Sequence, residues 1–109
     1  MVFYAAEHDD PNEEATTHAQ KNLGLMYLEG KGVPTNFSKS FKWLLKSAER
    51  GNLIAQLQVG ILYAQGMGVP ADPVRAYMWT SIAQAQGSED AKNNLLELQK
   101  NMTPAQITK

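Results

Sequence analysis

Residues 60–70 of the chain, GILYAQGMGVP, decide the fold, because residues 24–34, GLMYLEGKGVP, show the same pattern 36 positions earlier. Glycine, tyrosine, valine and proline coincide at this one offset, and the alignment needs no gap. A repeat of this length is the sequence signature of stacked supersecondary units. The same offset also relates Ala19, Ala55 and Ala91, Trp43 and Trp79, and Gly51 and Gly87.

Each unit is predicted to consist of two helices, as the second unit illustrates. Asn52 can cap a helix over residues 53–65, whose apolar side chains recur at helical spacing on one face. Residues 66–70, GMGVP, end this helix, because glycine permits positive φ and proline cannot continue a helix. The second helix opens at Asp72-Pro73 and ends before Gly87, so the two helices form an antiparallel hairpin.

The first unit and the C-terminal segment vary this plan. The first helix is expected from near Pro11 to about Glu29, and its partner from about Phe37 to Arg50. A last helix, from Ser88 to about Met102, has Leu96 where both repeats have glycine, and we interpret it as a terminal cap. The predicted fold is a single all-α domain, with repeat 1 at about 16–51, repeat 2 at about 52–87 and the cap at 88–109.

The composition argues against several classes of protein. With 109 residues, of which 43% are hydrophobic and 19% charged, the chain can form one packed core. A net charge of −1 disfavours nucleic acid as a partner, and the absence of cysteine excludes disulfides and thiolate metal sites. No apolar run approaches the roughly 20 residues that span a bilayer. The first residues are too acidic for a signal peptide, which leaves the compartment open.

The recurring residues resemble the motif of the Sel-one-like repeat family, a relative of the tetratricopeptide repeats, over about residues 3–107. The departures are mild: Val59 replaces leucine, Asn36 replaces aspartate, and Ser40 and Ser47 replace alanine. The resemblance implies a right-handed α/α superhelix that acts as a protein-interaction scaffold, often in the bacterial envelope or in bacterial signalling. The matching residues are Ala19, Leu23, Gly24, Tyr27, Gly30, Gly32 and Val33, then Ala55, Gly60, Tyr63, Gly66, Gly68, Val69, Asp72 and Ala76.

The recurring aromatic residues are predicted to lie in the core, because each repeat would fill the same space with the same shape. Gly24 and Gly60 are predicted to let the two helices of each hairpin approach closely. The aromatic residues concerned are Tyr27, Trp43, Tyr63 and Trp79.

The remaining motifs indicate ordinary structure. Residues 30–32 and 66–68, GKG and GMG, end helices and lack the strand and the Gly-Lys-Ser/Thr sequence of a phosphate loop. His8 and His18 lie among acidic residues but lack the i, i+4 spacing of a helical metal site, so a solvated loop is favoured. We therefore predict no catalytic, metal-binding or cofactor-binding residue. A hydrolase-like enzyme stays a minor alternative, which predicts a deep polar pocket with convergent carboxylates.

The candidate partner-binding residues lie on the first helix of each repeat and face away from the hairpin. Their large aliphatic members would form a stripe across neighbouring helices, and contiguous apolar surface often marks a partner site. The alternative is burial of these side chains against Leu96, Leu98 or a C-terminal segment that folds back. The candidates are Lys21, Leu25, Leu28, Glu29, Leu57, Ile61 and Gln65, with Ala64 on the same face.

The leading hypothesis is a non-catalytic scaffold that binds a protein or peptide on the concave face formed by the first helices. It needs no cofactor. A purely structural role is the alternative, because residues 3–7 match residues 45–49, the tail of a second helix. The chain would then be the C-terminal end of a longer solenoid, and could self-associate through its N-terminal end.

Overall fold

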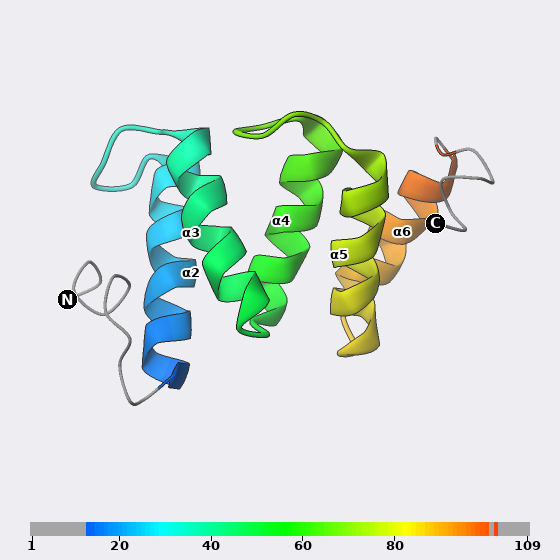
Figure 1. Ribbon diagram of the computed structural model, residues 1–109, viewed down its shortest axis with the longest axis horizontal. Helices are drawn as coiled ribbons and strands as arrows, with labels where there is room; N and C mark the ends of the chain where they lie inside the picture. Colours follow the sequence, from blue (N-terminus) through cyan, green and yellow to red (C-terminus); the bar gives the residue numbers. More distant parts are fainter. Residues whose placement is uncertain (1–12, 101, 103–109) are drawn as a thin grey trace.

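The structure is a computed structural model that describes residues 13–100 and Met102, and its described part consists of helices without strands (Figure 1). The predicted all-α solenoid is confirmed. The expected helix start near Pro11, the segment 3–7 and the residues after Met102 lie outside the described residues. The helices are α2 (Glu13–Glu29), α3 (Phe37–Glu49), α4 (Leu53–Gln65), α5 (Pro73–Ala85) and α6 (Glu89–Lys100).

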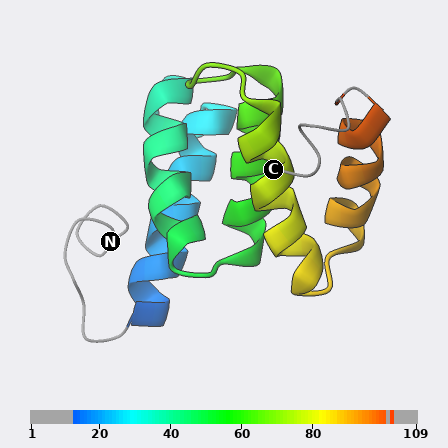
Figure 2. The same cartoon turned by 45° about the vertical axis from the view of Figure 1, so that its right-hand side comes forward.

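Each helix packs against the helix that follows it in the chain, and successive helices alternate between two layers. Helices α2 and α3 form the first hairpin, α4 and α5 the second, and α6 packs on α5 and also touches α4. Figures 1 and 2 show the same row of alternating helices from two directions. We call the side formed by α2, α4 and α6 the A-helix face, and the side formed by α3 and α5 the B-helix face. None of the described helices is both long and apolar enough to cross a membrane.

Side-chain caps explain where the helices begin. Asn36, Asn52 and Asp72 each accept a hydrogen bond from the backbone N–H three residues further on, over 2.9–3.0 Å. The Ser88 hydroxyl oxygen accepts from the N–H of Ala91 over 3.0 Å, so α6 begins where the sequence predicts. Each cap satisfies a backbone donor that has no partner within the helix.

Glycine determines where α4 ends. Gly66 adopts the left-handed conformation with φ of 68°, which a residue with a side chain rarely tolerates. Gly68, with φ of 74°, lies so close to the backbone of Phe37 that a side chain at this position would collide with it. The turn between α4 and α5 therefore packs directly on the start of α3. This contact holds the second repeat against the first.

The core consists of two clusters of buried apolar side chains. The larger cluster joins α3, α4 and α5, and the smaller joins α2 and α3. The ring of Phe41 meets that of Tyr63 edge-on, with the ring centres 5.1 Å apart. The larger cluster contains Leu44, Ala48, Ala55, Val59, Leu62, Tyr63 and Ala76, and the smaller contains Ala19, Leu23 and Trp43.

Both helical glycines lie at the close approaches predicted for them. A Cβ atom on Gly24 would lie 2.5 Å from Cγ of Leu44, and one on Gly60 would collide with Oγ1 of Thr80. Since real Cβ contacts are longer, the two helices of each hairpin could not pack as they do with any other residue there.

The prediction that all four recurring aromatic residues lie in the core is only half right. Trp43 and Tyr63 are buried, with 6% and 9% of their surface exposed, but Tyr27 and Trp79 are half-buried. Tyr63 is covered by Phe41 from the neighbouring repeat, whereas Tyr27 belongs to the first described helix. Burial at a repeated position therefore depends on the neighbouring helix as well as on the residue itself.

The two serines that depart from the motif tie α3 to α2. The Ser40 hydroxyl donates to the carbonyl oxygen of Gly24, and the Ser47 hydroxyl donates to that of Thr17, each over 2.8 Å. Both serines are fully buried. Their counterparts in the second repeat, Ala76 and Ala83, are buried without a hydroxyl, so the first hairpin has two bonds that the second lacks.

Candidate binding site on the A-helix face

The structure distributes the candidate partner-binding residues between the core and the surface of the A-helix face. Leu25 and Leu28 on α2 are half-buried and pack against the larger core cluster. Leu57 and Ile61 on α4 are half-buried, as is Lys21 on α2. Glu29 and Gln65 are exposed at the ends of their helices, and a carboxylate oxygen of Glu29 lies 3.9 Å from Nζ of Lys31.

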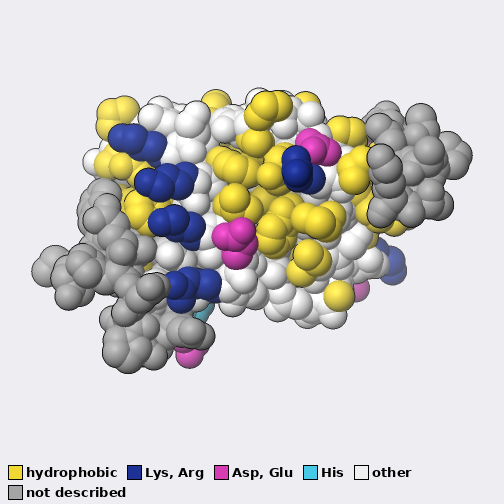
Figure 3. All heavy atoms as spheres, viewed as in Figure 1, with side chains coloured by type: hydrophobic (Ala, Val, Ile, Leu, Met, Phe, Trp, Pro, Cys, Tyr) yellow, Lys and Arg dark blue, Asp and Glu magenta, His cyan; other side chains and the backbone are white. Residues whose placement is uncertain are grey.

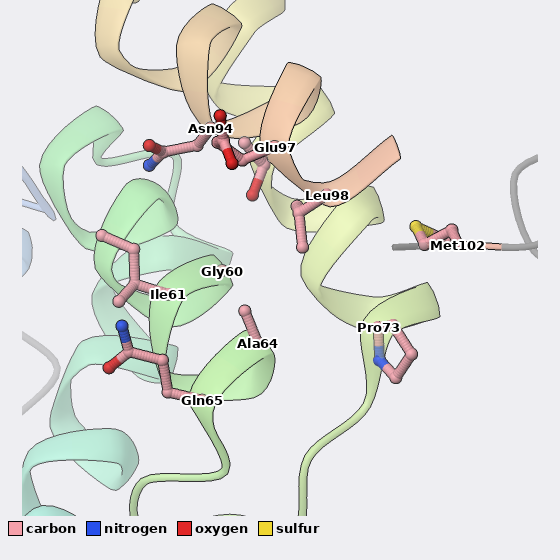
Figure 4. Close-up of a pocket in the computed structure, with 10 residues that line it drawn as sticks. Gly60, Ile61, Ala64, Gln65, Pro73, Asn94, Glu97, Leu98 and Met102 are labelled. Atoms are coloured by element: carbon pink, nitrogen blue, oxygen red, sulfur yellow. The ribbon is translucent and has the colours of Figure 1, made fainter. Parts of the chain in front are cut away.

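A cavity of about 310 Å³ opens on this face between α4, α5 and α6. Figure 4 shows Ala64 of α4 and Leu98 of α6 pointing toward one another across it, with Pro73 from the start of α5 beside them. Two of the candidate residues, Ile61 and Gln65, line this cavity, whereas the α2 candidates do not. The lining residues are Gly60, Ile61, Ala64, Gln65, Pro73, Thr80, Asn94, Glu97, Leu98 and Met102.

A difference in side-chain size between Leu28 and Ala64 explains why the cavity lies beside α4. Leu28 and Ala64 occupy the same position in successive repeats, 36 residues apart. Leu28 packs against the larger core cluster, but the single methyl group of Ala64 is exposed and lines the cavity. A small residue where the previous repeat has a large one leaves space that no other described side chain fills.

The chemistry of the cavity suits binding better than catalysis. Its lining combines apolar side chains, such as Ile61, Leu98 and Met102, with polar groups that include the amides of Gln65 and Asn94. Glu97 is the one carboxylate among the described lining residues, and it lies 3.1 Å from Nζ of Lys100. The convergent carboxylates that the hydrolase alternative predicts are therefore not among the described residues of this cavity.

The histidines do not build a metal site within the described residues. Nε2 of His18 lies 3.8 Å from a carboxylate oxygen of Glu14, one helical turn away, and both side chains are exposed. His8 lies outside the described residues. In residues 13–100 and 102, no three side chains of the metal-binding types come together.

Reasoning from sequence did not assign the terminal cap to this site, although its burial alternative named Leu98 as a contact of the outward stripe. Asn94, Glu97 and Leu98 of α6 form the wall opposite α4, and Met102 follows it. The 36-residue offset held a signal for one of them, since Glu97 occupies the position of Leu25 and Ile61. The change from leucine to alanine between residues 28 and 64 was a second signal, because it predicts a void beside α4.

The chain matches one known family of helical repeats. The sequence profile of the Sel1 repeat matches residues 17–52 and again residues 53–88. No functionally curated protein matches the chain.

Two solved structures are similar to it. A crystal structure of a Sel1 repeat protein from Oxalobacter formigenes has a TM-score of 0.73 and 38% sequence identity, over 78% of this chain. The crystal structure of c5321, a protective antigen present in uropathogenic Escherichia coli strains that displays an SLR fold, has a TM-score of 0.79 and 28% identity, over 98% of this chain. The chain spans about a quarter of each of these proteins, 26% in both cases.

Proposed function

The chain belongs to the Sel1 repeat family, and from this we propose that it binds an extended or helical segment of a partner protein on its A-helix face. Sel1 repeat proteins are generally protein-interaction scaffolds and typically non-catalytic. The proposal adds the face and the anchor point: the cavity between α4, α5 and α6 would hold an apolar side chain of the partner.

The cavity beside Ala64 is the observation that carries the proposal. Its volume of about 310 Å³ lies at the lower end of the usual range for ligand pockets, so it suits one anchoring side chain. The half-buried Leu57 and Ile61 extend the apolar surface along α4. Gln65 and Asn94 offer amide groups at which a partner backbone could form hydrogen bonds.

The test fills the cavity without touching the core. Peptides are selected from a random displayed library against the wild-type chain, and their Kd values are then measured for Ala64→Arg and for Ala85→Arg. Both alanines are exposed helical residues, but only Ala64 lines the cavity, so the second variant is a matched control. Excluding one apolar side chain should cost about 1.5–3 kcal/mol, or about ten- to hundredfold in Kd, for Ala64→Arg alone.

Amide resonances provide a second, independent measurement. Addition of a selected peptide should shift the signals of Ile61, Ala64 and Leu98, and it should leave those of α3 in place. Equal peptide affinity in the two arginine variants, together with shifts confined to other residues, would show that the A-helix face is not the site.

A purely structural role is the second candidate, because the similar solved proteins are about four times as long as the aligned segment. The chain would then form one end of a solenoid and would have no ligand of its own. Concentration-dependent self-association in sedimentation experiments, without any enriched peptide in the selection, would favour this role.

A further inference from the structure

Three lysines form a row along the exposed side of α3. Lys39, Lys42 and Lys46 are three and four residues apart, so they share one face of the helix and span about 10 Å along its axis. All three are exposed, and Figure 3 shows a row of basic side chains running along α3. Positive charge is therefore concentrated on one helix of a chain whose net charge is −1.

Aromatic rings hold these lysines in position. Nζ of Lys42 and Nζ of Lys46 lie 5.0 Å and 4.9 Å from the centre of the Trp43 ring. Nζ of Lys39 lies 5.5 Å from the centre of the Tyr27 ring. A cation–π contact attracts an ammonium group but leaves its charge in place. The rings thus limit the movement of the lysines without neutralising them.

The described part of the chain supplies no carboxylate within ion-pair distance of these three ammonium groups. Three other exposed cations have such neighbours. Lys31 pairs with Glu29, Arg75 with Asp72, and Lys100 with Glu97, at 3.9, 3.2 and 3.1 Å. Within the described residues the row on α3 is therefore not paired with acidic groups, and it can attract the carboxylates of another molecule.

Two of the three corresponding positions of α5 are apolar, and the third, Arg75, is basic as Lys39 is. Met78 and Ile82 occupy the places of Lys42 and Lys46, 36 residues on, and 45% and 38% of their surface is exposed. Figure 3 shows apolar side chains gathered beside the basic row, over α4 and α5. Because the second repeat keeps the fold with apolar residues at two of these positions, the packing of the helices does not require the charges of Lys42 and Lys46.

We propose that the B-helix face is a second binding surface, formed by the lysine row of α3 and the apolar side chains of α5. We call it the B-helix surface and define it by Lys39, Lys42, Lys46, Met78 and Ile82. Its partner is an acidic amphipathic helix of another protein. That helix places carboxylates three or four residues apart toward α3, and aliphatic side chains toward α5.

The mixture of charge and apolar surface favours this partner over nucleic acid or a membrane. Nucleic acid would meet Met78 and Ile82, which offer no contact to phosphate, and three cations form a small footprint for a polyanion. A membrane-binding helix sets its apolar and basic residues along one helix, so that both reach the same lipid interface. Here the two kinds of residue lie on separate helices of the B-helix face, α3 and α5.

The test uses a synthetic, fluorescently labelled helical peptide that has glutamate and leucine at these spacings. Its matched partner has glutamine in place of every glutamate. Binding is measured by fluorescence anisotropy at low and at physiological salt. The acidic peptide should bind more tightly than the glutamine peptide, and its affinity should fall as salt is added.

Substitutions in the chain then locate the surface. The triple variant Lys39→Gln, Lys42→Gln, Lys46→Gln should weaken binding about tenfold, which corresponds to about 1.4 kcal/mol. The control triple Lys31→Gln, Lys92→Gln, Lys100→Gln changes the net charge equally and should leave Kd nearly unchanged. The pair Met78→Ser, Ile82→Ser should also weaken binding. The control pair Ile54→Ser, Leu96→Ser replaces side chains that are at least as exposed, and it should not weaken binding.

Several outcomes would overturn the proposal. Equal binding of the two peptides would show that carboxylates are not recognised, and equal losses in the two lysine triples would show that net charge alone matters. Tighter binding of phosphatidylserine vesicles or of a single-stranded oligonucleotide through the same lysines would show that the partner class is wrong. Ala64→Arg should bind the acidic peptide normally, so failure on the A-helix face and failure on the B-helix surface are distinguishable.

Discussion

Replacement of Gly60 by alanine tests the close approach of α4 and α5. The added methyl group would collide with Oγ1 of Thr80 and lie 3.4 Å from the carbonyl oxygen of Ala76. Thr80 cannot easily turn away, because it is β-branched, 1% exposed, and its hydroxyl donates to that carbonyl over 2.6 Å. Overpacking costs about 1–3 kcal/mol, and because Thr80 is held in place we expect about 2–3 kcal/mol here. Alanine returns about 1 kcal/mol through its higher helix propensity.

The expected net loss for Gly60→Ala is about 1–2 kcal/mol, which should lower Tm by about 5–15 °C. Urea unfolding followed by far-UV circular dichroism measures the loss. The double variant Gly60→Ala, Thr80→Ala removes the obstructing hydroxyl, so the two substitutions should couple by about 2 kcal/mol in a double-mutant cycle. A Gly60→Ala chain as stable as the wild type, or a cycle without coupling, would refute the argument from helix contact.

The two tryptophans should differ although they occupy the same repeat position: Trp43→Ala should destabilise the fold by about 3–5 kcal/mol and Trp79→Ala by clearly less, because only Trp43 is buried. Equal losses in urea unfolding would contradict this. Loss of both buried serine hydroxyls, in Ser40→Ala with Ser47→Ala, should cost about 1–3 kcal/mol in total. Unchanged Tm would show that these bonds are not stabilising. Removal of the α5 cap in Asp72→Ala should cost about 1 kcal/mol, and Asp72→Asn should restore most of it in the same thermal unfolding assay.

The site could be predicted only in part. The periodicity of α4 identified Ile61 and Gln65 as residues of the outward face, and both line the cavity. Periodicity does not say how deep a neighbouring helix lies, so it could not separate Leu25, which packs on the core, from Ile61. The sequence predicted a contact with α6 only in the burial alternative, through Leu98, because this helix departs from the motif. The change from Leu28 to Ala64 indicates a missing side chain, but the width of the gap between α4 and α6 depends on how the helices pack.

One pair of repeat positions makes an aromatic contact at the first repeat boundary and a hydrogen bond at the second. Phe41 and Tyr63 form an edge-on aromatic contact between the repeats. Their counterparts 36 residues on, Tyr77 and Gln99, form a hydrogen bond of 3.3 Å from Nε2 of the glutamine to the tyrosine oxygen. The cap therefore docks on α5 through the register of the repeat, although its own sequence has lost most of the motif.

The sequence alone determined the helices, their order and their pairing into hairpins. Caps, turn glycines and apolar spacing are local signals, and a residue such as Asp72 or Gly66 acts on the backbone within a few positions of itself. Only the tertiary structure decided which repeated residues are buried, where the cavity opens and which lysines pair with a carboxylate among the described residues. These properties depend on distances between helices. Trp43 and Trp79 therefore occupy equivalent positions of the repeat but differ in burial.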